Sequence, residues 1–274
     1  MINRILNNIK KPHKIPYKLI SKIKFIINKK KYNKEFFENQ QNDIFNKLDF
    51  DRPLGLEKLN KIKEKYNFLN EDEMKSEHQV LFSSLSCSLK FHINEILEIG
   101  TFEGANAFLL SLLFENSNIE TIDLESDKDD FKNFYNRKNN INKFIEKRNN
   151  NLSRNKKIKF KEINSIKLIN YKKKYDLIWI DGAHGYPVVC MDILNSIKLI
   201  SEGGYILCDD IYINNITSDK MYRSNAGYET LNELKKEGII NFELIFKRLD
   251  ADNNCLKENR KFIAIVSLVS SKNY

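Results

Sequence analysis

The chain has 274 residues, of which 30% are charged and 41% are hydrophobic, and its formal net charge is +9. This composition is typical of a soluble globular protein, and no window approaches the ~20 apolar residues that cross a bilayer. The stretch from Met1 to Ile27 also lacks the apolar core and small-residue cleavage site of a signal peptide. Four scattered cysteines, Cys87, Cys190, Cys208 and Cys255, favour reduced thiols in a cytoplasmic protein over a disulfide framework.

The stretch from Met1 to Lys34 is rich in lysine and almost free of acids. Isoleucines and a leucine between Leu19 and Ile27 recur at helical spacing beside a basic face, and such a helix could lie on an anionic membrane surface. The alternative is a helix that packs on the protein's own body or on a partner subunit of a homo-oligomer. We expect no nucleic-acid partner, because lysine is enriched along the whole chain and no nucleic-acid-binding module or zinc-ligand spacing is present.

Residues 35–70 are predicted to form short helices and loops, with a turn at Pro53 and Gly55. Residues 71–92 predict a helix, because acidic residues at its start complement the helix dipole and apolar residues recur along it. We therefore divide the chain into a basic, mostly helical extension, residues 1–70, and an α/β domain, residues 71–274.

From residue 95 onward, strand patterns alternate with helix patterns. Short apolar runs predict strands at residues 95–99, 119–124, 158–163, 175–181, 205–208, 242–247 and 262–268. Helical spacing predicts helices at 105–114, 188–200 and 228–236, and residues 125–156 are expected to be helical in part. This alternation predicts a doubly wound, Rossmann-like, mostly parallel sheet of seven strands. Because a loop rather than a helix joins the last two strands, they predict an antiparallel hairpin at one edge.

The first predicted strand runs into a turn that is bracketed by Gly100 and Gly104. Glycine accepts a positive φ and lets a ligand approach the backbone closely. The helix that follows points free N–H groups at the turn, as suits a nucleotide-like or carboxylate-bearing ligand. An ordinary tight strand–helix connection has the same pattern, so this motif depends on support from the other strands.

Polar residues follow the other parallel strands at the same edge of the sheet, which is where ligands of such sheets bind. They are Asp123 after the second strand, Asn164 and Ser165 after the third, Asp181 and His184 after the fourth, and Asp209 and Asp210 after the fifth. An acid at the tip of the second strand holds a ribose diol in nucleotide-binding folds. Taken singly, Asp181 could cap a helix, His184 could pack under its loop, and Asp209-Asp210 could form a solvated turn.

These motifs resemble those of class I S-adenosylmethionine-dependent methyltransferases over about residues 75–270. The resemblance rests on Leu97-Glu98-Ile99-Gly100-x3-Gly104, Thr121-Ile122-Asp123-Leu124, Tyr175-Asp176-Leu177-Ile178-Trp179-Ile180-Asp181-Gly182-Ala183-His184 and Gly203-Gly204-Tyr205-Ile206-Leu207-Cys208-Asp209-Asp210. The Asp-Gly-x-His and Asp-Asp pairs look more narrowly like metal-assisted O-methyltransferases of small molecules and sugars, such as the macrocin type. The basic extension that precedes the α/β domain is not explained by the resemblance.

The resemblance implies a role for each matching position. Cofactor contacts are implied for Glu98, Gly100, Thr101, Gly104 and Asp181, with Asp123 on the ribose hydroxyls and Asn164 or Ser165 near the adenine. Many relatives place an acid at the Asn164 position, so this chain departs from them there. Asp181, Asp209 and Asp210 are implied as ligands of Mg2+ or Mn2+, and His184 as the general base. Carboxylates suit a hard cation that lowers the pKa of a hydroxyl, and a histidine can take the proton near neutral pH.

We therefore expect an O-methyltransferase that uses S-adenosylmethionine and methylates a hydroxyl of a small molecule or glycan. A surface-polysaccharide sugar is the favoured acceptor, because a basic amphipathic start suits glycan assembly at the inner face of the membrane. One alternative is a cephalosporin-hydroxylase-like member of the superfamily. Another is a catalytically inactive methyltransferase fold that serves as a binding or scaffold protein, although the acids at the strand tips argue against it. A nicotinamide dehydrogenase is disfavoured, because residues 100–104 lack the Gly-x-Gly-x-x-Gly spacing.

Overall fold

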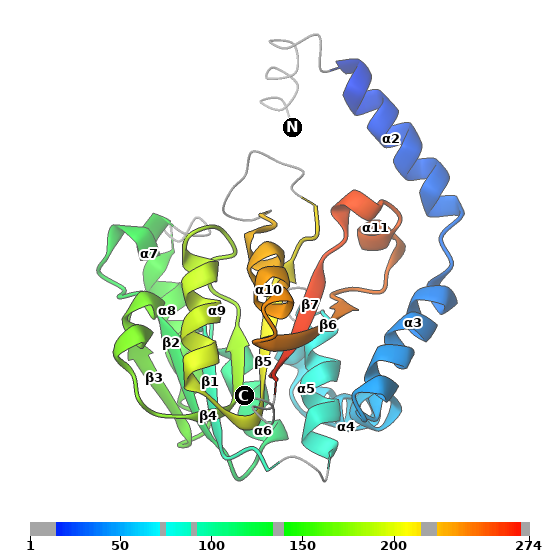
Figure 1. Cartoon of the computed structure of the whole chain (residues 1–274). Helices are drawn as coiled ribbons and strands as arrows, with labels where there is room; N and C mark the ends of the chain where they lie inside the picture. The colour runs from blue at the N-terminus through cyan, green and yellow to red at the C-terminus, as the bar shows by residue number, and fades with distance from the viewer. Residues whose placement is uncertain (1–14, 72–74, 89–91, 134–139, 215–223, 270–274) are drawn as a thin grey trace.

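A computed structural model describes residues 15–71, 75–88, 92–133, 140–214 and 224–269 (Figure 1). In these residues one sheet has the strand order β3-β2-β1-β4-β5-β7-β6. The strands are β1 (Glu95–Ile99), β2 (Asn118–Asp123), β3 (Ile158–Glu162), β4 (Tyr175–Ile180), β5 (Ile200–Ile211), β6 (Ile240–Phe246) and β7 (Phe262–Leu268). Strands β1 to β5 pair in parallel, whereas β7 is antiparallel to both β5 and β6. The predicted doubly wound, seven-stranded sheet with an antiparallel edge hairpin is confirmed.

Helices cover both faces of this sheet (Figure 1). The described helices of the sheet region are α5 (His78–Cys87), α6 (Ala105–Leu113), α7 (Asp129–Asn133), α8 (Ile141–Leu152), η5 (Ser165–Asn170), α9 (Val188–Leu199), α10 (Ala226–Lys236), α11 (Ala251–Asn254) and η6 (Lys257–Asn259). Successive residues of β4 join two different cores: Leu177 and Trp179 pack with α5 and α6, and Ile178 and Ile180 pack with α9 and α10. Because a strand alternates its side chains, a central parallel strand must be apolar on both faces, as β4 is from Leu177 to Ile180.

Before the sheet region lie α2 (Ile15–Lys30), α3 (Lys34–Lys47), α4 (Arg52–Lys65) and η2 (Asn67–Asn70). The side chain of Gln41 on α3 pairs with the backbone of Phe246, accepting its N–H and donating to its carbonyl oxygen. This contact covers part of the edge strand β6, whose backbone would otherwise be unpaired on that side. Phe45, Phe50, Leu59 and Leu69 belong to the same core as β4 and α5, so residues 34–70 pack directly on the sheet region.

The predicted turn at Pro53 and Gly55 is wrong, because both residues lie in the first turns of α4. Asp51 caps this helix, and proline is tolerated in the first turn, where its missing N–H has no intrahelical partner. A Cβ atom on Gly55 would lie 2.1 Å from the Oγ of Ser84 on α5. The glycine therefore allows the close approach of two helices rather than a chain reversal.

The helix predicted for residues 71–92 is shorter in the structure, where α5 begins at His78 and ends at Cys87. Residues 72–74 and 89–91 of that prediction lie outside the described residues. Glu77, just before α5, donates its backbone N–H to the carbonyl oxygen of Lys247 and forms an ion pair with Arg52. These tertiary contacts hold the residue before the helix in place. Among the described residues, none of the helices combines the length and the apolar character needed to cross a bilayer.

Candidate active site

A cavity of about 560 Å³ opens beyond the carboxyl ends of β1, β2, β4 and β5. Its size is within the range of small-molecule and cofactor sites. Most of the residues predicted for the site line it: Gly100, Thr101, Asp123, Asn164, Ser165, Asp181, His184, Asp209 and Asp210. Glu98 and Gly104 do not belong to its lining. The parallel strands thus bring all five predicted strand tips to one cavity.

The turn after β1 has the backbone that its glycines suggested. Gly100 and Gly104 have φ values of 102° and 74°, in the left-handed region that favours glycine. Gly104 is the N-cap of α6, and no side chain caps that helix end. The first turn of α6 therefore presents N–H groups beside the cavity, which Ala105 and Asn106 line.

Glu98 lies behind the cavity wall rather than on it. Its carboxylate accepts hydrogen bonds from Asn106 at 2.8 Å and from the hydroxyl of Thr121 at 2.5 Å. Burial raises the pKa of Glu98 to about 7, although both hydrogen bonds oppose that shift. Because Asn106 lines the cavity, Glu98 is placed to fix the side chain of a lining residue.

Asp123 ends β2, and both of its carboxylate oxygens accept backbone N–H groups. Phe102 donates to Oδ2 at 3.1 Å, and Leu124 donates to Oδ1 at 2.8 Å. A carboxylate offers about four lone-pair positions, so these bonds orient Asp123 without exhausting its capacity for hydroxyl groups. Asn164 has a local task as well, because its Oδ1 accepts the N–H of Ile166 and caps η5.

The tip of β5 carries Asp209 and Asp210 at a bulge, where the pairing with β7 shifts register. Asp210 has a φ of 52°, which is uncommon for a residue other than glycine. In a regular strand two successive side chains would point to opposite faces. The bulge instead lets both carboxylates reach the same partner, and strained backbone of this kind is often found at functional sites.

That shared partner is Lys247, which directly follows β6. Its Nζ lies 2.5 Å from Asp209 Oδ2 and 2.5 Å from Asp210 Oδ1. Lys261, directly before β7, places its Nζ 2.6 Å from Asp210 Oδ2. Burial works against the charges of this cluster, but the opposite charges raise the pKa of Lys247 and hold that of Asp210 below its usual range.

Sequence reasoning missed both lysines. They lie on the antiparallel hairpin, outside the run of parallel strand tips, and in a chain so rich in lysine neither position stands out. Only the pairing of β6 with β7 and of β7 with β5 brings them to the cavity.

The predicted metal site is not confirmed. Within the part of the chain that the structure describes, no three His, Cys, Asp or Glu side chains form a group that could hold a metal ion. Asp209 and Asp210 point carboxylate oxygens at ammonium groups instead, and those groups carry the positive charge that a cation would bring. The residues as arranged do not fit Mg2+ or Mn2+.

His184 lies close to two of the acids that line the cavity. Its Nε2 is 3.5 Å from Asp181 Oδ1 and 3.9 Å from Asp210 Oδ2. Burial lowers the pKa of His184, which keeps the imidazole neutral at neutral pH. Burial and the charge of Asp209 raise the pKa of Asp181 well above its usual range.

A second histidine, His78 at the start of α5, also lines the cavity. It stacks on Trp179, with 5.5 Å between the ring centroids, and burial lowers its pKa to about 4. Sequence reasoning missed it because His78 is on a helix that precedes the first strand. No strand-tip pattern could have indicated it.

Comparisons with known proteins agree with this geometry. Residues 97–211 match a protein-family model described as a methyltransferase domain. No curated protein sequence matches the chain. A "putative O-methyltransferase" from Klebsiella pneumoniae has a TM-score of 0.51 at 12% identity, over 86% of this chain and 99% of that chain.

Two further solved structures are similar at lower TM-scores. The O-methyltransferase TomG from Streptomyces achromogenes, in complex with S-adenosylmethionine, has a TM-score of 0.47 at 13% identity, covering 65% of this chain and 74% of its own. An O-methyltransferase from Bacillus cereus in complex with S-adenosylhomocysteine has a TM-score of 0.44 at 19% identity, with 64% and 74% covered.

The family match extends from β1 to β5 and so includes every strand tip that lines the cavity. The Klebsiella pneumoniae structure shares the fold over nearly its whole length. The predicted resemblance is confirmed at this level, without its metal-dependent sub-type: residues 97–211 match a methyltransferase domain, and the sheet that contains them has the methyltransferase fold.

Proposed function

We propose that the protein is an O-methyltransferase that moves a methyl group from S-adenosylmethionine to a hydroxyl of a small molecule or sugar. The observation that carries this proposal is the position of His184. A buried imidazole with a lowered pKa lines the same cavity as the cofactor motifs. A neutral imidazole is the form that can take a proton from a hydroxyl.

The residues of the chain fit the cofactor. Asp123, at the tip of β2, is held by two backbone N–H groups and can accept hydrogen bonds from a ribose diol. The uncapped start of α6 suits the carboxylate of the methionine part. S-adenosylmethionine supplies a methyl group on a positively charged sulfur, which keeps the electron pair when an oxygen takes the methyl.

His184 would accept the hydroxyl proton at Nε2 as the acceptor oxygen forms its new bond to carbon. The resulting imidazolium would lie 3.5 Å from a carboxylate oxygen of Asp181 and 3.9 Å from one of Asp210. Asp210, whose pKa is held below its usual range, stays ionised and can stabilise this positive charge, whereas the raised pKa of Asp181 favours its uncharged form. The cavity lining also includes the polar residues Glu71, Glu103 and Arg248, which suit an acceptor with several hydroxyl groups.

The Mg2+ or Mn2+ that the resemblance implied, from three acids at two strand tips, is not part of this proposal. A cation could reach Asp209 and Asp210 only by displacing the ammonium of Lys247. The proposal includes a sugar of surface-polysaccharide assembly as the acceptor, and the basic N-terminal helix supports this choice.

The test combines cofactor binding with turnover. Calorimetry should show binding of S-adenosylmethionine, and incubation with a panel of sugars, sugar nucleotides and phenols should release S-adenosylhomocysteine. Failure to bind the cofactor would overturn the proposal. Binding without any methyl transfer across the panel would favour the cephalosporin-hydroxylase-like or scaffold alternative instead.

A further inference from the structure

The ammonium of Lys247 occupies the position that the sequence pattern assigns to a divalent cation. It makes two short ion pairs, to Asp209 and to Asp210, from a residue that is only 8% exposed. Both of these acids are predicted metal ligands. The positive charge at this point of the cavity is therefore part of the chain itself.

The backbone of Lys247 is fixed from two sides. Its N–H donates to the carbonyl oxygen of Lys261 at 2.9 Å, and its own carbonyl oxygen accepts the N–H of Glu77 at 2.9 Å. Glu77 is in turn held by Arg52, whose guanidinium lies 2.9 Å from its carboxylate. Three segments that are distant in sequence thus place this lysine, which distinguishes it from a surface lysine that happens to meet an acid.

The charges at the tip of β5 are already matched. Two carboxylates, Asp209 and Asp210, meet two ammonium groups, Lys247 and Lys261. A divalent cation added beside these lysines would be repelled strongly, because charges interact more strongly in a buried site than in water. The two acids and the two ammonium groups thus balance in charge without a metal ion, while Asp209 Oδ1 is buried and accepts no hydrogen bond from the residues that the structure describes.

We propose that Lys247 replaces the divalent cation of metal-assisted O-methyltransferases, so that methyl transfer by this chain needs no metal. This proposal rests on the proposed function. An ammonium group has three N–H donors, and Asp209 and Asp210 accept two of them. Because Lys247 lines the cavity, its third N–H can be donated to the acceptor oxygen.

In this arrangement the two basic side chains have separate tasks. His184 takes the hydroxyl proton, whereas Lys247 keeps all its protons and stabilises the negative charge that grows on the oxygen. Once the oxygen has taken the methyl group, the proton remains on His184 until it exchanges with water.

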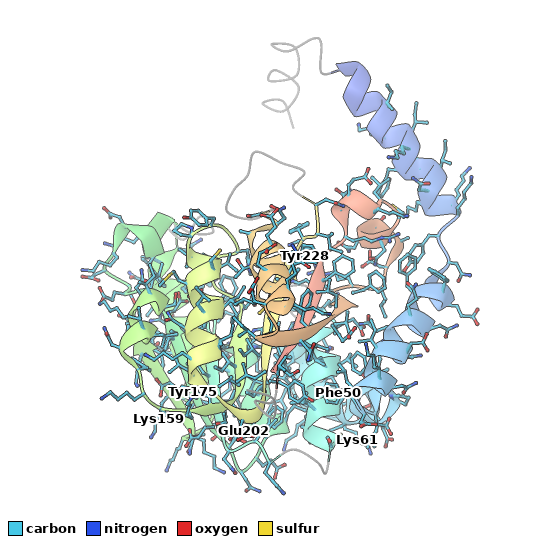
Figure 2. The ribbon with its side chains drawn as sticks, in the orientation of Figure 1. Phe50, Lys61, Lys159, Tyr175, Glu202 and Tyr228 are labelled. Atoms are coloured by element: carbon cyan, nitrogen blue, oxygen red, sulfur yellow. The ribbon has the colours of Figure 1, made fainter. Side chains whose placement is uncertain are left out.

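The experiment uses the full chain, the Lys247→Ala and Lys247→Arg variants, and Lys159→Ala as a matched control. Lys159 is an exposed lysine of β3, at the periphery of the molecule in Figure 2. Binding of Mn2+ is titrated by electron paramagnetic resonance, S-adenosylmethionine binding by calorimetry, and turnover is measured before and after exhaustive chelation with elemental analysis.

We expect wild type and Lys159→Ala to bind no Mn2+ and to keep full turnover after chelation. Lys247→Ala should lose roughly 10²-fold in kcat, the scale for removing one donor to a developing negative charge, and should gain Mn2+ binding at the vacated acids. Lys247→Arg should keep more activity than Lys247→Ala and should not gain Mn2+ binding.

Mn2+ binding by wild type, or turnover that chelation abolishes and Mn2+ restores, would overturn the proposal. So would a folded Lys247→Ala variant with wild-type turnover. If that variant does not fold, the wild-type Mn2+ titration still decides. A wild type that binds neither S-adenosylmethionine nor Mn2+ would instead refute the proposed function.

A second, independent observation concerns α2, which extends away from the sheet in Figure 1. Four isoleucines of this helix, Ile20, Ile23, Ile26 and Ile27, are between 49% and 63% exposed. Lys24 and Lys29 on the same helix form ion pairs with Glu258 and Asp252 of the region around α11. At about 3.6 residues per turn Lys29 lies on the side away from the isoleucines and Lys24 lies at the edge of their stripe. The exposure of the four isoleucines shows that the described part of the chain leaves this stripe open to solvent.

We infer that this stripe docks on an anionic lipid surface. Residues 1–34 contain ten lysines, one arginine and no acid, so the charge of the helix and its surroundings is complementary to acidic headgroups. An apolar stripe flanked by lysines combines the two contributions that hold a helix in a membrane interface. A second copy of the chain would bring the same positive charge and would be repelled.

Co-sedimentation with vesicles of equimolar phosphatidylcholine and phosphatidylglycerol tests this inference, with pure phosphatidylcholine as the neutral comparison. Wild type should bind the anionic vesicles, and Ile23→Gln/Ile27→Gln should lose roughly tenfold or more in binding. The matched control, Ile169→Gln/Ile239→Gln, removes two exposed isoleucines elsewhere and should bind like wild type. Equal binding by both double variants, or no binding by wild type, would overturn the inference of lipid docking. It would also be overturned if wild type were a dimer that only Ile23→Gln/Ile27→Gln dissociates.

Discussion

A Cβ atom on Gly100 would lie 2.2 Å from the carbonyl oxygen of Asp181. The two residues follow β1 and β4, which pair directly, and the N–H of Asp181 donates to the carbonyl oxygen of Ile99 at 2.8 Å. The turn after β1 therefore packs against the strand tip that carries Asp181 and precedes His184. Glycine is needed here for packing between strand tips as well as for its positive φ.

Replacing Gly100 by alanine should destabilise the fold by about 2–4 kcal/mol, because it adds a backbone clash to the cost of a positive φ. Gly203→Ala is the matched control, since Gly203 has a φ of 76° but no atom within 4 Å of an added Cβ. It should cost only about 1–2 kcal/mol. Urea unfolding measures both free energies. Equal costs would show that the contact with Asp181 can relax.

Asp123 is the residue on which cofactor affinity should depend. Asp123→Ala should weaken S-adenosylmethionine binding by about 1–3 kcal/mol, the scale for leaving a polar partner unmatched. Asp127→Ala, at a side chain that is 77% exposed, is the control. Calorimetry gives the affinities and thermal unfolding confirms that both variants fold. An unchanged S-adenosylmethionine affinity of folded Asp123→Ala would show that Asp123 does not bind the ribose.

The parallel half of the sheet could be predicted from the sequence because its strands are short apolar runs with polar residues at one end. Once such strands lie in parallel, their carboxyl ends must meet, and Asp123, Asp181 and Asp209 do line one cavity. The sequence also indicated the edge hairpin, from the loop that joins its strands.

What the sequence could not predict depends on tertiary contacts. Lys247 reaches the acids because β7 inserts between β5 and β6, and no local pattern indicates that strand order. His78 reaches the cavity because α5 stacks it on Trp179. Gly55 lies inside a helix because α5 packs so closely against α4 at this point that there is no room for a side chain. Judged from the sequence alone, a glycine near a proline predicts a turn.

Glu98 should make stability fall as pH rises. Its pKa in the fold is about 7, above the usual 4.5, so between these values the folded state binds more protons than the unfolded state. The free energy of unfolding should therefore drop by up to ~3 kcal/mol from pH 4.5 to pH 7, at about 1.4 kcal/mol per pKa unit.

Glu98→Gln keeps the shape and cannot ionise, so its stability relative to wild type should rise across that range. Its amide can donate to Thr121, which can then donate to Thr101, 2.6 Å away. Urea unfolding at several pH values measures the effect. A difference between variant and wild type that does not change with pH would contradict the raised pKa.

His78 should have the opposite effect on stability. Its pKa falls from 6.5 in the unfolded chain to about 4 in the fold, so the unfolded state binds more protons between these values. Stability should therefore decrease as pH falls from 6.5 to 4, and His78→Phe, which keeps a ring beside Trp179, should lack this decrease. The same unfolding series measures it, and parallel curves for variant and wild type would contradict the prediction.

His184 carries the proposed chemistry, and its pH dependence is the sharpest check on it. Because burial lowers its pKa, the acidic limb of kcat should lie below the 6.5 of an ordinary histidine. His184→Gln keeps polarity but cannot take a proton, so kcat should fall roughly 10²–10⁴-fold while S-adenosylmethionine affinity stays within about twofold. His92→Gln, at an exposed histidine before β1, should match wild type. Profiles of kcat against pH for the three proteins decide between two roles. If His184→Gln loses rate and its acidic limb together, His184 is the base; if it keeps both, the histidine only packs beneath its loop and another group must remove the proton.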